Sequence, residues 1–325
     1  RTGPAPRPGP EAVPSRMLAF LLPALLPVVE RLAQWLPRPA AYAVAEVAGR
    51  AWHRWSPARR AVVAANLARV CAATGRPTRG REFNRLVRRA FVEHARYWLE
   101  VLRAPSWRAD KLDRMLTAED WEEWRPVFAG GVVVGVPHLG NFEPFAHFLA
   151  VHGITGVAPV EETRPFALYR FLLKRRLVGG KGVQLVPLSR AMRPMMAALR
   201  RNQLVALAAD RDLSGTGVPL TFFGHTATIP AGPATLAVRA GKPLLVARAL
   251  RTAPEQFHGR AWAVDVPRSG DAAADVRALT EAMARRFEEA IAEAPEQWWG
   301  AFQPFWPDMR GSVPRKAAAR EAARA

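Results

Sequence analysis

From residue 131 onward, short and continuously apolar runs alternate with amphipathic stretches, and few folds accommodate this alternation. A run that is apolar at every position suits a strand covered on both faces, because a half-solvated strand alternates apolar and polar residues. We therefore expect an α/β fold with a mostly parallel central sheet flanked by helices on both faces. The expected strands are 132–136, 153–159, 183–188, 204–209, 219–223, 243–250 and 261–266. The expected helices are 142–151, 165–178, 190–201, 231–240 and 273–294.

The first third of the chain has a different pattern. Residues 40–105 place apolar side chains three and four positions apart, which is the spacing of amphipathic helices. The 325-residue chain contains neither Gly/Ser linkers nor internal repeats, so one domain is expected over 17–309. That domain would have a helical N-terminal part at 17–105 and an α/β part at 131–309. The segment PLTFF-GHTATIP (219–230) predicts a β-hairpin at one edge of the sheet.

The chain is strongly basic, with a formal net charge of +19. Residues 1–16 are Pro-rich and are expected to be a disordered tail, and residues 310–325 are expected to be a frayed basic tail. The tails hold a minor part of the excess, so the body itself is basic. Such a body suits an anionic membrane surface, a phosphorylated substrate or nucleic acid, although GC-rich coding would also enrich arginine. No nucleic-acid-binding motif is present, so nucleic acid is not an expected partner.

Residues 17–29 form the most apolar segment. They are fewer than the roughly 20 apolar residues that span a bilayer, and Pro23 and Pro27 interrupt them. The segment therefore predicts an interfacial element on a membrane, which makes the protein peripheral or monotopic. Cys71 is the only cysteine, so an internal disulfide and a cysteine metal site are excluded and a cytoplasmic location is favoured.

The segment VPHLGNFE (136–143) places His138 at the end of a predicted strand and Glu143 five residues later. On one helix these side chains would point about 140° apart, so they cannot share a face. The pattern instead requires Gly140 in a turn, Asn141 as the helix cap and Glu143 in the first turn. This geometry favours the hypothesis that a neutral His138 serves as general base and that a carboxylate fixes its tautomer. A purely structural histidine beside a helix-start glutamate is the alternative.

Other polar groups lie where further elements begin or end. Residues 210–212 (DRD) follow a predicted strand, the loop 214–217 offers amides to an anion, and Gly232-Pro233 begins a helix. The basic residues of 160–182 form either a solvated helix face or a clamp for phosphates. The aromatic residues of 298–306 indicate core packing first and a membrane rim second. The spacing of His138 and Glu143 does not match a zinc helix, so no metal site is expected.

Seven segments occur in a characteristic order. They are NLARV (66–70), ARYWLE (95–100), VPHLGNFE (136–143), EETRP (161–165), ADRDLSGTGV (209–218), FFGHTATIPAGPATLA (222–237) and PEQWWGAFQPFW (295–306). Together they resemble the lipid A late acyltransferase-like family of the lysophospholipid acyltransferase superfamily. Within it they are similar to the actinobacterial phosphatidylinositol mannoside acyltransferases, over about residues 40–307.

This resemblance implies an O-acyltransferase that moves a fatty acyl chain from acyl-CoA to a sugar hydroxyl of a glycolipid. It implies a position on the cytoplasmic face of the plasma membrane and no cofactor besides acyl-CoA as co-substrate. His138 would be the base, Asp210 its carboxylate partner and Glu143 a supporting motif carboxylate. The residues expected to bind acyl-CoA are Arg176, Thr216, Arg211 and Arg164.

Two positions depart from the mannoside enzymes. Phe142-Glu143 stands where Trp-Asp is usual, and Gln297-Trp298-Trp299 stands where Asp-Trp-His is usual. The acceptor therefore stays open between a phosphatidylinositol mannoside and another lipid, such as a lipid A-like molecule. A non-catalytic basic membrane-binding protein is the third hypothesis, but it leaves the base and carboxylate at the strand ends unexplained.

Overall fold

A computed structural model describes residues 16–107, 109–162, 169–171, 173, 182–212, 215–266 and 269–309. The two predicted tails, apart from Arg16, and most of the predicted helix at 165–178 lie outside these residues. No helix in the described part of the chain combines the length and apolar character needed to cross a bilayer.

The centre of the fold is a seven-stranded sheet with the order β1-β9-β8-β2-β5-β3-β4. Strands β2, β3, β4, β5 and β8 are parallel, whereas β9 runs antiparallel to β8 and β1 runs parallel to β9. The mostly parallel sheet is therefore confirmed. The strands are β1 Leu116–Ala118, β2 Val133–Val136, β3 Gly156–Val160, β4 Val183–Pro187, β5 Leu204–Ala208, β8 Leu244–Ala253 and β9 Gln256–Ala263.

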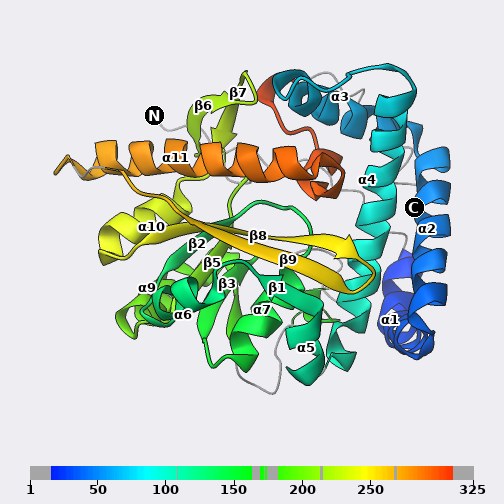
Figure 1. Cartoon of the computed structure of the whole chain (residues 1–325), viewed down its shortest axis with the longest axis horizontal. Helices are drawn as coiled ribbons and strands as arrows, with labels where there is room; N and C mark the ends of the chain where they lie inside the picture. Colours follow the sequence, from blue (N-terminus) through cyan, green and yellow to red (C-terminus); the bar gives the residue numbers. More distant parts are fainter. Residues whose placement is uncertain are drawn as a thin grey trace.

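Helices cover both faces of this sheet (Figure 1). Val133, Val205 and Val246 pack in a large core with α9, α10 and α11. Their neighbours Val134, Leu204 and Leu245 pack in a second core with α6 and α7. Because both faces of the central strands β2 and β5 are largely buried, these strands are apolar throughout. These helices are α5 Ala109–Met115, α6 Trp121–Ala129, α7 Phe142–Val151, α9 Met192–Arg200, α10 Gly232–Ala240 and α11 Ala272–Glu293.

Four helices form the predicted helical N-terminal part: α1 Arg16–Trp35, α2 Arg38–Trp55, α3 Pro57–Ala73 and α4 Gly80–Arg103. Helix α4 stands at the end of the β8–β9 hairpin, and α1 and α2 lie outside it (Figure 1). Short 3₁₀ turns complete the fold: η1 Ala104–Ser106, η2 Leu188–Arg190, η3 Pro295–Gln297, η4 Trp299–Phe302 and η5 Pro307–Met309.

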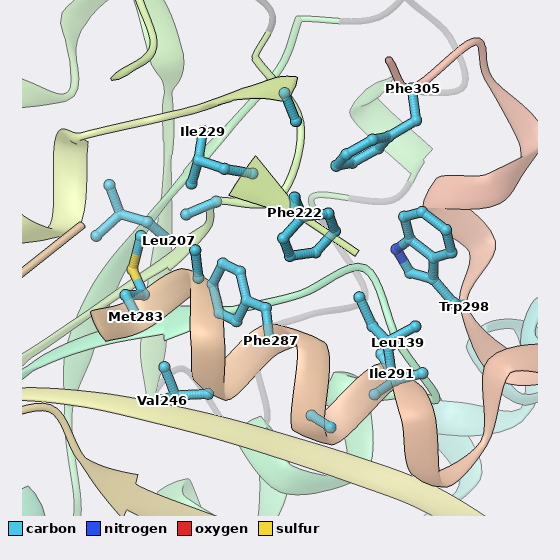
Figure 2. Packing of buried hydrophobic residues seen from close by; sticks show 14 of the residues in the cluster. Leu139, Leu207, Phe222, Ile229, Val246, Met283, Phe287, Ile291, Trp298 and Phe305 are labelled. Carbon is cyan, nitrogen blue, oxygen red and sulfur yellow. The ribbon is translucent and has the colours of Figure 1, made fainter. Parts of the chain in front are cut away.

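The hairpin of β6 (Val218–Phe222) and β7 (His225–Ile229) is present, but its predicted place at an edge of the main sheet is wrong. It forms a separate two-stranded sheet, because its apolar side chains pack on the C-terminal aromatic segment. Phe222 lies 5.3 Å from Phe305 between ring centroids, and its carbonyl accepts a hydrogen bond from Trp306 Nε1 at 3.3 Å. Figure 2 shows Phe305 and Trp298 beside Phe222 in this core. Core packing of the aromatic segment is thereby confirmed.

Candidate active site

Two neighbouring parallel strands bring His138 and Asp210 together. In the register of β2 and β5, Val136 lies opposite Ala208, so residues two positions further on leave the sheet at the same level. There His138 Nδ1 and Asp210 Oδ1 form a hydrogen bond across 72 residues of sequence. The carboxyl ends of strands in an open α/β sheet are where ligands ordinarily bind.

The chain turns from β2 into α7 as the sequence predicted. Gly140 has φ +62°, and a Cβ there would lie 2.0 Å from the carbonyl oxygen of Ala249, so only glycine fits this close approach to β8. Asn141 caps α7, its side chain accepting a hydrogen bond from the Glu143 amide at 3.0 Å. Glu143 lies in the first turn of α7 and is buried. In the described residues, the hydrogen-bonding partner of the His138 ring is Asp210 and not Glu143.

Asp210 is fully buried and accepts hydrogen bonds at both carboxylate oxygens. Oδ1 contacts His138, and Oδ2 accepts a hydrogen bond from Trp298 Nε1 at 3.0 Å. Burial alone would raise the pKa of the Asp210 carboxyl. The charge of His138 and the hydrogen bonds from His138 and Trp298 outweigh burial, so this pKa lies below its usual value. An ionised carboxylate is therefore held against the imidazole.

His138 is oriented from three sides. Its carbonyl accepts hydrogen bonds from the amides of Trp299 at 2.9 Å and Gly300 at 3.4 Å. The Trp299 ring meets the imidazole edge-on, with 4.6 Å between centroids. With Nδ1 bonded to a carboxylate, the proton of the neutral ring lies on Nδ1 and the lone pair on Nε2. The side chain remains 15% exposed, so the pair has the chemistry of a general base at the protein surface.

A buried ionic network lies behind the α7 cap, and sequence analysis did not predict it. Asn141 Nδ2 donates to Glu100 at 2.8 Å, and Arg251, near the end of β8, donates to both carboxylate oxygens of Glu100 and to Glu93. Burial lowers the pKa of Arg251, but these carboxylates raise it above its usual value. Tyr42 also donates to Glu100. The network fastens α2, α4 and β8 to the residue that caps α7.

A cavity of about 340 Å³ opens beside Asp210, walled partly by Arg211, Asp212 and Phe305. Asp212 accepts hydrogen bonds from the amides of Gly215 at 2.8 Å and Gly217 at 3.0 Å, so it holds these two residues close to the end of β5. Thr216 is an exposed residue of that loop. The structure thus places Arg211 and Thr216 near the end of β5. Arg164 and Arg176 lie outside the described residues.

One contact of the site could not be read from the sequence. Trp298 is a member of an aromatic cluster, and nothing local distinguishes it from its buried neighbours. Its partner Asp210 lies 88 residues away, and Gly300 allows the approach, because a Cβ there would lie 2.5 Å from Trp298 Nε1 and 2.8 Å from Asp210 Oδ2.

Comparison with known proteins agrees with this architecture. The family model of the bacterial lipid A biosynthesis acyltransferases matches residues 12–306. A phosphatidylinositol mannoside acyltransferase of Mycobacterium tuberculosis (strain CDC 1551 / Oshkosh) is 35% identical over 223 residues, which cover 66% of this chain and 67% of that protein. One from Mycolicibacterium smegmatis (strain ATCC 700084 / mc(2)155) is 32% identical over 228 residues, covering 68% and 72%. The chain is therefore an acyltransferase and belongs to the bacterial lipid A biosynthesis acyltransferase family.

Proposed function

We propose that this protein transfers a fatty acyl chain from acyl-CoA to a sugar hydroxyl of a glycolipid, and that the acceptor is a phosphatidylinositol mannoside. The contact between His138 and Asp210 at the ends of β2 and β5 carries the catalytic part of the proposal. The likeness to the mycobacterial mannoside acyltransferases supports the choice of acceptor.

The proposed reaction is a direct transfer. Nε2 of His138 takes the proton from the acceptor hydroxyl while the hydroxyl oxygen attacks the thioester carbonyl carbon. The tetrahedral intermediate collapses, its C–S bond breaks, and an ester and the CoA thiolate form. The imidazolium returns the proton to the thiolate, so the enzyme ends unchanged. Asp210 is a positioning residue that fixes the ring tautomer and stabilises the imidazolium.

The surroundings of this pair suit an anionic donor. Arg211 lies on the wall of the cavity beside Asp210, and the loop containing Thr216 adjoins it. Guanidinium groups bind phosphates through paired hydrogen bonds. In this proposal Arg211 and Thr216, together with Arg164 and Arg176, bind acyl-CoA.

The outward surface of α1 and α2 supports a membrane location. This surface, called the outer face below, consists of the exposed apolar residues Leu25, Val28, Val29, Leu32, Trp35, Val44, Val47 and Trp55. Trp35 is 81% exposed and Trp55 is 77% exposed. Apolar patches with aromatic residues mark membrane or protein interaction sites. We propose that the outer face docks on the cytoplasmic leaflet of the plasma membrane, so that the protein is peripheral or monotopic.

The test uses the purified full chain, palmitoyl-CoA and three detergent-dispersed acceptors: a phosphatidylinositol mannoside, a lipid A precursor and a glycerophospholipid. CoA release is followed with a thiol reagent, and products are identified by mass spectrometry. We expect an acylated mannoside. Acylation of another lipid alone would overturn the proposed acceptor but retain the reaction. No acceptor-dependent CoA release with any of them would overturn the reaction.

A further inference from the structure

A second concave site lies between α2, α3 and α4, and none of its lining residues lines the cavity beside Asp210. Its cavity has a volume of about 970 Å³. Four arginines line it and define the arginine groove: Arg60, Arg81, Arg85 and Arg88. His53 and Asn84 also line it. Arg60 is held by a hydrogen bond to the His53 carbonyl at 2.9 Å, whereas Arg81, Arg85 and Arg88 are exposed.

The charges of this groove are not neutralised within the described part of the chain. No aspartate or glutamate described in the structure lines the groove, and none forms an ion pair with its four arginines. Arg81, Arg85 and Arg88 recur at four- and three-residue spacing on one side of α4, where like charges repel. Other arginines of the same helix are paired: Arg89 with Glu296 at 3.3 Å and Arg96 with Glu93 at 2.8 Å.

The positive charge of the groove affects the pKa of His53. Burial lowers the pKa of its ring, and the charges of Arg60 and Arg88 lower it further. An anion in the groove would relieve this repulsion, and arginine is the side chain best shaped for phosphate oxygens.

The position of the groove indicates the source of the phosphate. The groove reaches the junction of α2 and α3, because His53 in the last turn of α2 and Pro57 at the start of α3 both line it. Trp55, the exposed last residue of α2, stands at the same junction and belongs to the outer face. A surface that combines inserted apolar residues with adjacent arginines matches an anionic membrane in both respects. We infer that the arginine groove binds the headgroup phosphates of anionic phospholipids in the membrane on which the outer face docks. This inference rests on the membrane location proposed above.

Sedimentation with vesicles tests the inference without any turnover. The full chain is mixed with vesicles of pure phosphatidylcholine or of phosphatidylcholine containing phosphatidylinositol. The groove variant is Arg81→Gln/Arg85→Gln/Arg88→Gln. The matched control is Arg193→Gln/Arg200→Gln/Arg239→Gln, which removes the same charge from exposed positions of α9 and α10 on the opposite side of the molecule (Figure 1).

Each basic residue near an anionic surface contributes a several-fold factor to binding, so the groove variant is expected to bind phosphatidylinositol vesicles roughly 10- to 100-fold more weakly. The control is expected to lose much less, and binding to pure phosphatidylcholine should be equal for all three proteins. Equal losses in the two variants would show that net charge alone acts and would overturn the groove. Unchanged binding of the groove variant would overturn it too.

A second measurement separates lipid phosphate from the phosphates of CoA. Acyl transfer to a detergent-dispersed acceptor is measured for the same variants, with the KM for acyl-CoA. An unchanged KM supports the lipid assignment. A KM raised several-fold with unaltered vesicle binding would assign the groove to the donor instead. Because vesicle binding requires no chemistry, failure of the groove and failure of the proposed acyl transfer give different results.

Discussion

The surroundings of His138 and the helical N-terminal part differ in whether their charged groups have partners within the chain. Around His138, the charged groups Asp210, Glu100 and Arg251 are buried and each has a partner within the chain. Arginines of α3 and α4 line a groove in which the structure describes no carboxylate, and apolar side chains of α1 and α2 face outward. The first region is complete in itself and preorganised, as a proton-transfer site must be. In the proposal above, the charges and apolar side chains of the second region are satisfied by a membrane outside the chain.

Disrupting the pair of His138 and Asp210 should have the largest effect on activity. Asp210→Asn keeps the shape of the side chain but removes the charge that stabilises the imidazolium and fixes its tautomer. We expect kcat to fall by roughly 10³- to 10⁴-fold, as in hydrolases whose histidine loses its carboxylate. The measurement is steady-state CoA release with saturating acceptor. A loss below tenfold would mean that Asp210 does not serve His138.

The next largest effect is expected on stability, when a residue of the buried ionic network around Arg251 is changed. Arg251→Met leaves Glu100 buried without its cation, whereas Glu93 keeps its ion pair with Arg96. Leaving a buried carboxylate unpaired costs about 3–5 kcal/mol of the free energy of unfolding. Urea denaturation measures this change. Arg114→Met is the control, because Arg114 forms an exposed ion pair with Asp110 worth less than about 1 kcal/mol. Equal and small losses of the free energy of unfolding in both variants would show that the network does not stabilise the start of α7.

The Trp298 hydrogen bond should have a moderate effect that depends on pH. Because the folded-state pKa of Asp210 is lowered, its contribution to stability is present above about pH 4 and is lost as pH falls through that lowered pKa. Trp298→Phe removes one cause of the lowering, so the variant should lose less stability than the wild type between pH 7 and pH 3. We also expect kcat to fall roughly tenfold, for a lost hydrogen bond of about 1.5 kcal/mol to a charged group.

Trp306→Phe is the matched control for this variant. Trp306 is equally buried and also donates one hydrogen bond, but to the Phe222 carbonyl rather than to Asp210. It should lower stability without altering its pH dependence. Identical pH profiles for the two variants would remove Trp298 from the site.

The smallest effect on stability is expected at the outer face. Val44→Ser/Val47→Ser exchanges exposed side chains of α2, so the free energy of unfolding should change by less than about 0.5 kcal/mol. Vesicle sedimentation should nevertheless fall severalfold. Leu188→Ser/Met192→Ser, at exposed apolar positions near α9, should leave vesicle binding unchanged. Equal binding by both variants would contradict docking through the outer face.

Local patterns in the sequence predicted the parts of the fold that depend on local interactions. The apolar runs, the helical spacing and the turn at Gly140 with its Asn141 cap all depend on neighbouring residues. Strand β1, only three residues long, gave no such signal, and the hairpin of β6 and β7 was misplaced because its partner, the aromatic segment, lies far along the chain.

The contacts of the site show the same limit. The spacing within VPHLGNFE pointed to Glu143 as the carboxylate beside His138. The pattern also placed Asp210 at a strand end, but only the family resemblance made it the partner of His138. Arg251 contacts Glu100 across 151 residues and Trp298 contacts Asp210 across 88. Such contacts depend on how the strands and helices pack together, and the spacing of residues within one segment does not predict that packing.

The most direct test of the account is acceptor-dependent CoA release by His138→Ala, measured beside acyl-CoA binding to the same protein. A lost general base costs about 10²- to 10⁴-fold in rate. We predict a fall in that range, with the affinity for acyl-CoA unchanged, since Nε2 acts only on the acceptor hydroxyl. Release within a few-fold of the wild-type rate would contradict His138 as the base and, with it, the mechanism proposed for the pair.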